Sequence, residues 1–146
     1  MSQKQSQGLG GLSYKSTNDL SGTASDVTNG NANGGTTYKN AIGMALVADT
    51  ANACSVVLAG ANVKILGVCA NNPKAGEPAQ LDSVRGTSTK VLVGAAVAKG
   101  DKLMTDSNGR FITAASTAQH ICGVAMEAAS AAGQMVEAVL LDDYVA

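Results

Sequence analysis

The sequence predicts an all-β protein, and three observations lead to this prediction. Short apolar runs alternate with turn residues at intervals of about ten residues, which is typical of an all-β domain. The chain is 45% hydrophobic but only 3% aromatic, so small aliphatic side chains must fill its core. Its 17 glycines interrupt the alanine-rich runs that would otherwise favour helices. A compact small β-barrel or β-sandwich is the architecture that fits this pattern.

The first element in chain order is residues 1–40, whose composition differs from the rest. Ser, Thr, Asn and Gly dominate it, as in the stretch 29–35. Such a segment cannot bury enough apolar surface to offset the cost of ordering it. We therefore expect a long flexible N-terminal arm over residues 1–40 and a β-rich domain over residues 41–146.

Residues 41–146 contain nine apolar runs of strand length. Turn residues separate these runs, and Pro73 and Pro78 flank a loop between two of them. The predicted strands cover residues 42–48, 55–58, 63–70, 79–84, 89–93, 102–105, 110–113, 120–127 and 135–141.

The clearest turn is the tetrapeptide Asp-Ser-Asn-Gly at residues 106–109. Asn-Gly supplies the positive φ angles of a tight hairpin, so residues 103–105 should pair antiparallel with residues 110–112. One or two short helical turns are expected, over residues 94–100 and 127–133, because these runs are rich in small residues.

An internal repeat supports the β prediction. The pattern Ile-x-Gly-Val occurs at residues 65–68 and again at residues 121–124. Each copy is followed by an Ala-Gly pair, at residues 75–76 and 132–133, and then by a partly apolar stretch. We interpret the two copies as strand–loop–strand units in which the strand glycine permits a bulge or a close approach of backbones.

The charge balance restricts the class of partner. The chain has 10 Lys and Arg against 11 Asp and Glu, a formal net charge of -1. This balance argues against nucleic acid as an electrostatic partner, because phosphate binding needs a clustered positive face. Only 14% of residues are charged, against about 25% in typical soluble domains. We expect copies of the same chain or another partner to cover much of the surface.

The sequence also bears on the cellular compartment. Its longest apolar run is far shorter than the roughly 18 residues that indicate a membrane span. Its first residues, Met-Ser-Gln-Lys-Gln, lack the apolar stretch of a secretory signal. We therefore expect no membrane partner and a protein that stays on the cytoplasmic side.

The three cysteines, Cys54, Cys69 and Cys122, form no CxxC pair, and His120 is the only histidine. These ligands and spacings do not make a zinc site, so no metal is expected. An odd number of cysteines in a chain without a signal sequence predicts reduced, buried thiols.

A nucleophilic pair of Cys122 and His120 is the strongest enzymatic hypothesis, because residues two apart on a strand share a face. Neighbours on one strand rarely align for proton transfer, so a core cysteine beside a half-buried histidine is the alternative interpretation.

Other candidate sites are weaker. A calcium loop from residue 106 would place Arg110 and Thr117 where oxygen ligands are required. Asp142 and Asp143 are explained by an exposed strand end, and no nucleotide-binding or nucleophile-elbow motif occurs. We therefore expect no enzymatic activity, cofactor or small-molecule substrate.

Several phrases of the second half resemble a known family. They read GAAVAKGDKL at residues 94–103, TDSNG at 105–109, GVAMEAA at 123–129 and AGQMVEAVLL at 132–141. Together with residues 65–68 and 75–79, they resemble the shared domain of tailed-bacteriophage capsid cement proteins, also called head decoration proteins. The resemblance covers about residues 41–146.

This resemblance implies a compact β-tulip-like domain that usually forms a homotrimer. It implies a structural virion protein, made in the host cytoplasm, that binds the outer capsid surface and clamps adjacent major capsid protein subunits. The arm in such proteins often becomes ordered only on the capsid. The family has no catalytic residues to transfer.

The apolar residues of the arm are the candidate capsid-binding residues. Our hypothesis assigns the contacts to Leu9, Leu12, Tyr14 and Leu20, spaced like those of a segment that lies along a partner's surface. Two alternatives stay open. The arm could be a disordered leader without function, and the chain could be another self-assembling β-rich subunit from a tail tube, a fibre or a surface layer.

Overall fold

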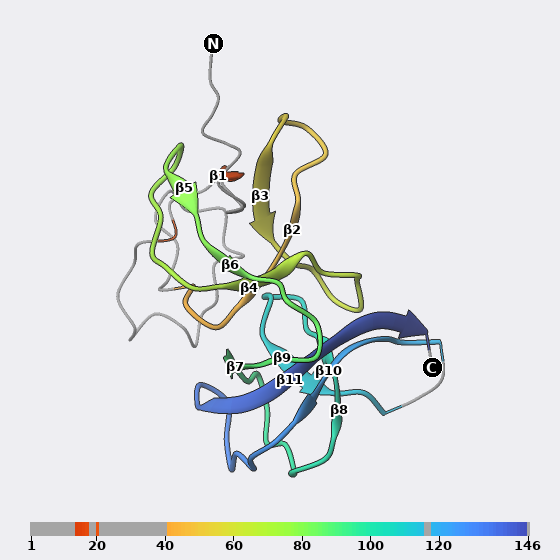
Figure 1. Ribbon diagram of the computed structural model, residues 1–146. Coiled ribbons are helices and arrows are strands. Elements are labelled where there is room, and N and C mark those ends of the chain that lie inside the picture. Colours follow the sequence, from red (N-terminus) through yellow and green to blue (C-terminus); the bar gives the residue numbers. More distant parts are fainter. Residues whose placement is uncertain (1–13, 18–19, 21–40, 116–117, 146) are drawn as a thin grey trace.

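A computed structural model describes residues 14–17, 20, 41–115 and 118–145, with the backbone alone for 142–144 (Figure 1). The fold is all-β, as predicted. Its strands are β1 (Tyr14–Ser16), β2 (Ala45–Ala48), β3 (Ser55–Leu58), β4 (Gly67–Cys69), β5 (Pro78–Ala79), β6 (Leu81–Asp82), β7 (Ser88–Leu92), β8 (Lys102–Thr105), β9 (Phe111–Thr113), β10 (His120–Ala125) and β11 (Met135–Val145).

Strands β1 to β6 form one sheet with the order β5-β1-β3-β2-β4-β6. Only Gln80 separates β5 from β6, so these two strands act as one bent strand. This bent strand pairs with β1 at one end and with β4 at the other, and thereby brings the two edges of the sheet together. We call this unit the N-terminal barrel.

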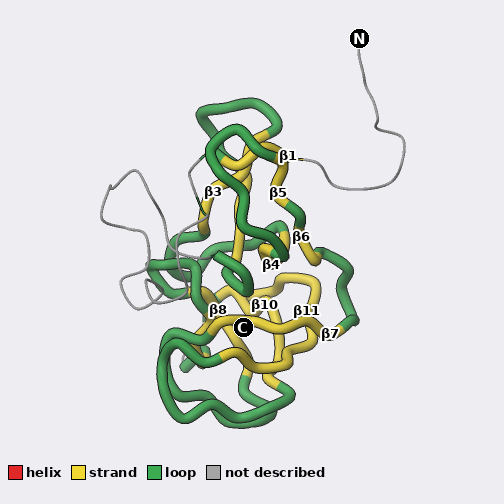
Figure 2. Tube along the Cα trace, turned by 90° about the vertical axis from the view of Figure 1, so that its left-hand side faces the viewer, coloured by secondary structure: helices red, strands yellow, loops and turns green. Residues whose placement is uncertain are grey.

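Strands β7 to β11 form the second sheet, with the order β7-β11-β10-β8-β9. Its two edges meet at a parallel bridge between Val93 and Phe111, where the amide of Gly94 donates to the Phe111 carbonyl at 2.9 Å. We call this unit the C-terminal barrel. The two barrels lie one above the other in both views (Figure 1, Figure 2).

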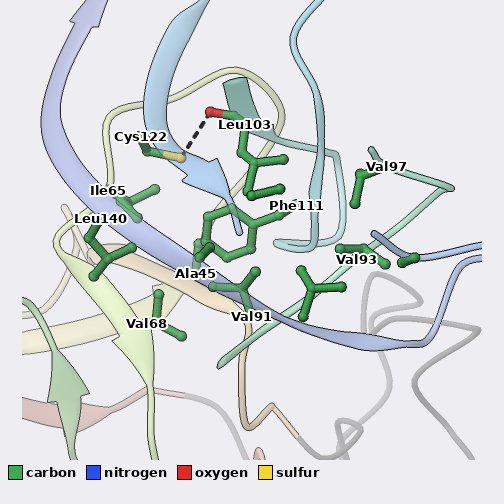
Figure 3. Packing of buried hydrophobic residues seen from close by; sticks show 14 of the residues in the cluster. Ala45, Ile65, Val68, Val91, Val93, Val97, Leu103, Phe111, Cys122 and Leu140 are labelled. Carbon is green, nitrogen blue, oxygen red and sulfur yellow. Dashed lines mark hydrogen bonds between the residues drawn. The ribbon is translucent and has the colours of Figure 1, made fainter. Parts of the chain in front are cut away.

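The larger buried cluster joins the two barrels. Ala45, Ile65 and Val68 of the N-terminal barrel belong to the same cluster as Val91 and Phe111 of the C-terminal barrel. Figure 3 shows the Phe111 ring in the middle of this cluster. A smaller cluster fills the N-terminal barrel, and it contains Leu20, Met44, Leu46, Val56 and Cys69.

The internal repeat predicted from the sequence is confirmed. Gly67 on β4 and Gly123 on β10 both lie against the backbone of the adjacent strand. An added Cβ would stand 2.8 Å from the Asp82 carbonyl oxygen at the first glycine and 2.9 Å from the Val139 carbonyl oxygen at the second. The predicted close approach of backbones therefore occurs in both units.

The repeat extends over the whole of both barrels. Strands β1, β2, β3 and β4 correspond to β7, β8, β9 and β10, and the bent strand β5–β6 corresponds to β11. Equivalent hydrogen bonds identify the register: the Gly76 amide donates to the Ser16 carbonyl at 2.8 Å, and the Gly133 amide donates to the Val93 carbonyl at 2.9 Å. The described part of the chain thus forms two copies of one five-stranded unit.

The strands at 55–58 and 102–105 have the predicted bounds, and the hairpin of β8 and β9 is antiparallel as predicted. Its turn is longer than the predicted tight turn, because Thr105 pairs with Phe111, and positive φ occurs at Gly109 but not at Asn108.

The short helical turns expected over 94–100 and 127–133 are wrong. Val97 and Ala129 instead exchange two backbone hydrogen bonds, of 3.0 and 2.9 Å, that join the two segments in an antiparallel bridge. The amides of Ala98 and Gly100, which a helical turn over 94–100 would use, instead donate to Asp101 Oδ2 at 2.9 Å and to the Ala125 carbonyl at 2.7 Å. Across the described ranges, no helix could span a membrane.

We predict that Gly123→Ala destabilises the fold by about 1–3 kcal/mol, because the new Cβ would force β10 and β11 apart. Chemical unfolding of the purified variant measures this change. The matched control is Gly60→Ala, where an added Cβ meets nothing within 4 Å. Equal unfolding midpoints for the two variants would show that the close approach at Gly123 is not a constraint.

Candidate functional site

The cysteine expected to act in an enzymatic site is a core residue. Cys122 is 0% exposed, and its thiol donates to the Leu103 carbonyl at 3.4 Å (Figure 3). His120 is half-buried on the same strand, and its backbone amide donates to Asn62 Oδ1 at 2.7 Å. A thiol without solvent access cannot meet a substrate, so the interpretation of Cys122 as a core residue fits this structure.

The prediction of buried thiols is confirmed for Cys69 and Cys122 and is wrong for Cys54. Burial raises the pKa of Cys69, whose thiol donates to the Asn71 carbonyl at 3.1 Å. Cys54 is exposed because it ends the turn between β2 and β3, with φ at 53°. In the part of the chain that the structure describes, His, Cys, Asp and Glu form no group of three that could hold a metal ion.

Asp106 organises the turn between β8 and β9. Its carboxylate accepts hydrogen bonds from the Asn108 amide at 2.8 Å, the Arg110 amide at 2.9 Å and Arg110 Nε at 3.1 Å. The turn lies between the barrels, since the Ala45 amide donates to the Gly109 carbonyl at 2.8 Å. The stretch that superficially resembles a calcium loop therefore acts as a hairpin turn that joins the two halves.

Asp49 is the equivalent of Asp106 in the N-terminal barrel, since it follows β2 as Asp106 follows β8. It accepts hydrogen bonds from Asn52 Nδ2 at 2.7 Å, Thr17 Oγ1 at 2.5 Å and the Ala51 amide at 2.9 Å. These three donors, in that order, lower the pKa of Asp49 from 3.8 to about 2. Asp49 thus links the turn between β2 and β3 to the N-terminal segment.

That segment fills a slot between β3 and β5. The amides of Lys15, Ser16 and Thr17 donate to the carbonyls of Cys54, Glu77 and Val56, at 3.0, 2.8 and 3.1 Å. β1 is parallel to β3 and antiparallel to β5, and among the described strands β5 pairs with β1 alone. The slot therefore binds an extended backbone on both of its edges.

The predicted arm contacts fall into two groups. Leu20 is 0% exposed, its amide donates to the Pro73 carbonyl at 2.7 Å, and half-buried Tyr14 packs against the same cluster. While the segment stays docked, the Leu20 side chain is not available to a partner. Leu9 and Leu12 lie outside the described residues, so their assignment stays a prediction.

The sequence analysis did not predict β1. This strand lies in a polar stretch and is too short to show a period-two pattern of apolar residues. The available signal was the pair of apolar residues Tyr14 and Leu20, which the structure brings together on one barrel.

A pocket of about 540 Å³ adjoins the docked segment at the turn between β2 and β3. Tyr14, Asp49, Asn52, Cys54 and Leu66 are among the residues that line it. It combines an ionised carboxylate, an amide and apolar side chains at the surface.

Large exposed apolar side chains offer further contact area. Leu66 and Val84 are 38% and 65% exposed and flank Arg85, which donates to the carbonyls of Ile65 and Leu66 at 3.0 and 3.3 Å. The other large exposed apolar residues among those described are Ile42, Met126, Met135 and Val145. These side chains are the large apolar groups that the described surface presents to solvent.

Comparisons with known proteins found a matching family and similar solved structures. A family model described as "phage cement protein" matches residues 43–141. A solved structure, "head fiber gp8.5 N base in bacteriophage phi29", is similar with a TM-score of 0.65 and 16% sequence identity, covering 92% of this chain and 95% of that one. No curated protein matches the sequence.

We predict that Asp49→Asn weakens the docking of the N-terminal segment, because it removes the charge that the three donors stabilise. The pKa of Asp49 is lowered in the folded chain, so its contribution is complete above about pH 4 and is lost as the pH falls through about 2. Hydrogen exchange at the Ser16 amide measures the docking. The variant should exchange faster than wild type at pH 6, and a ratio independent of pH would contradict this account.

Proposed function

The chain belongs to the phage cement protein family, and from this membership we propose that it binds the outer surface of a phage capsid and clamps adjacent major capsid protein subunits. The family match over residues 43–141 is the observation that carries the proposal. Capsid association and a structural role follow from the family. What we propose beyond the family is that the protein lies on the outer surface of the capsid and that it clamps adjacent major capsid protein subunits.

The surface of the chain suits this role. Only 14% of its residues are charged, Leu66 exposes apolar area in the pocket at the turn between β2 and β3, and Val84 is 65% exposed. We propose that the protein acts as a homotrimer, made in the host cytoplasm. A trimer engages several capsid sites together, and each later contact then forms at a high effective concentration.

The N-terminal arm adds contacts in this proposal. Docking of Tyr14–Ser16 fixes where the preceding residues leave the barrel, beside β3 and β5. Leu9 and Leu12 would then contact a neighbouring capsid subunit, and an extended segment there could pair with a sheet edge of that subunit. Tyr14 and Leu20 would hold the arm on its own barrel.

We do not propose an enzymatic role. The strongest enzymatic hypothesis rests on the Cys122 thiol, which is 0% exposed. The proposed function requires no cofactor, nucleic acid or membrane.

The paired substitution Leu9→Ser with Leu12→Ser tests the arm. We expect it to weaken binding to expanded capsids that lack this protein by at least tenfold, which is about 1.4 kcal/mol, since two apolar contacts are lost. Co-sedimentation of purified protein with such capsids measures the affinity. The control is Lys4→Ser with Gln5→Ser, and equal affinity of both double variants would remove the arm from the mechanism.

Native mass measurement of the purified protein tests the assembly. The proposal expects a small closed trimer until capsids are added. The likeness to the base of a head fiber makes a fibre subunit the alternative worth testing. Rings or filaments of the purified protein would favour that alternative over the clamp.

A further inference from the structure

The turns after β2 and β8 are equivalent, but only the second leads into an arginine. The Asp49 amide donates to the Ser55 carbonyl at 2.9 Å, just as the Asp106 amide donates to the Arg110 carbonyl at 2.8 Å. Ser55 therefore takes the place of Arg110 in the N-terminal copy. Its side chain is short and neutral, and its hydroxyl donates to the Ala53 carbonyl at 3.1 Å.

In the C-terminal copy the carboxylate of the turn is paired with a cation. Arg110 Nε donates to Asp106 Oδ2 at 3.1 Å, and the two side chains are only 12% and 14% exposed. A carboxylate that is largely removed from water needs such a partner, because it has lost most of its hydration. The C-terminal copy thus shows the kind of partner that the carboxylate of this turn accepts.

The N-terminal copy gives its carboxylate hydrogen bonds but no positive charge. Asp49 Oδ2 accepts from Thr17 Oγ1 and Asn52 Nδ2, and Asp49 Oδ1 accepts from the Ala51 amide. All of these donors are neutral, and they lower the pKa of Asp49 to about 2, so that the carboxyl is ionised near neutral pH. Among the described residues, no lysine or arginine forms a salt bridge with Asp49.

The pocket of about 540 Å³ at the turn between β2 and β3 lies against this carboxylate. Among the described residues that line it, Asp49 is the only charged one, and Tyr14 and Leu66 add an aromatic ring and an aliphatic side chain. Lys15 pairs with Ser55 across β1 and β3 but does not line the pocket. A guanidinium group fits these walls, because it is planar, stacks on aromatic rings and donates to carboxylates.

From these observations we propose that the pocket at the turn between β2 and β3 binds an arginine side chain of the major capsid protein. This contact rests on the proposed capsid binding and adds to it the chemistry of one partner residue. The guanidinium donates to Asp49, as that of Arg110 donates to Asp106 within the chain, and packs against Tyr14. A lysine would supply the charge without the planar group.

A second copy of the chain is a poor source of this arginine. Arg85 and Arg110 are the only arginines in the sequence. Arg85 donates to the carbonyls of Ile65 and Leu66 at 3.0 and 3.3 Å, and Arg110 is paired with Asp106. Both are thus engaged within their own chain, which leaves the capsid protein as the source.

Substitutions of Asp49 and Thr17 separate the charge from the docking of the N-terminal segment. Asp49→Asn keeps the shape of the side chain and removes its charge, whereas Thr17→Val keeps the charge and removes one contact of the segment. Binding to expanded capsids that lack this protein is measured by co-sedimentation. We expect Asp49→Asn to weaken it by roughly tenfold or more, and Thr17→Val to weaken it less.

Three results of this experiment would overturn the arginine contact. Wild-type affinity of Asp49→Asn would do so, and so would an equal loss for Thr17→Val, since the effect would then come from the docked segment. Both results would leave the proposed capsid binding untouched. If wild-type protein itself does not bind the capsids, the proposed function fails and the arginine contact fails with it.

Ser55→Arg gives the N-terminal copy an arginine of its own at the place equivalent to Arg110. We expect this side chain to fill the pocket and to weaken capsid binding by roughly tenfold or more, with unchanged hydrogen exchange at the Ser16 amide. The matched control is Ala128→Arg, which adds the same charge at an exposed position outside the pocket. Equal capsid affinities of the two variants would show that the pocket takes no part in binding.

Chemical modification of the capsids identifies the cation. Phenylglyoxal blocks arginine side chains, and acetic anhydride removes the charge of lysine side chains. Intact capsids with blocked arginines should bind the wild-type protein roughly tenfold more weakly or worse, whereas acetylated capsids should keep their affinity. The reverse pattern would overturn the assignment of arginine in favour of lysine.

Discussion

The strands of this protein are very short, and each one needs a hydrogen-bonded neighbour on both of its edges. The rest of the structure depends on this constraint. Several strands have only two to four residues, so none is stable alone. Closing each sheet on itself supplies the missing partners and removes exposed edges. In the C-terminal barrel the contact of Val93 with Phe111 brings the edges together, and in the N-terminal barrel the bent strand β5–β6 does so by pairing with β1 and with β4.

This constraint explains why the arm and the domain meet. Residues 14–17 and 20 contribute backbone pairs and a buried leucine to the barrel, so this part of the arm has a structural role in addition to any contact with a partner. Asp49 stabilises its turn as Asp106 does, but the two carboxylates differ in one partner. Asp49 Oδ2 accepts a hydrogen bond from Thr17 Oγ1, whereas Asp106 Oδ2 accepts one from Arg110 Nε. The N-terminal copy thus uses the shared turn to retain a segment, and the C-terminal copy uses it to join the barrels.

Much of the fold could be predicted from the sequence, because its signals are local. The period of apolar residues located most strands, and the recurrence of Ile-x-Gly-Val revealed the two units through glycines that lie against neighbouring backbones. The helical turns over 94–100 and 127–133 could not be rejected, since Val97 meets Ala129 only in three dimensions. β1 was missed for the same reason. Its hydrogen bonds to β3 and β5 make it a strand, and its own short polar sequence has no periodic pattern that predicts one. The family phrases predicted the class of protein, whereas the role of Leu20 depended on the barrel around it.

The most direct test of the central claim is a reconstruction, by electron cryomicroscopy, of expanded capsids before and after addition of the purified protein. The account predicts added density on the outer surface, fitted by the two stacked barrels and touching at least two neighbouring major capsid protein subunits. Added density that lies on the inner surface or touches one subunit alone, or no added density at saturating protein, would contradict it.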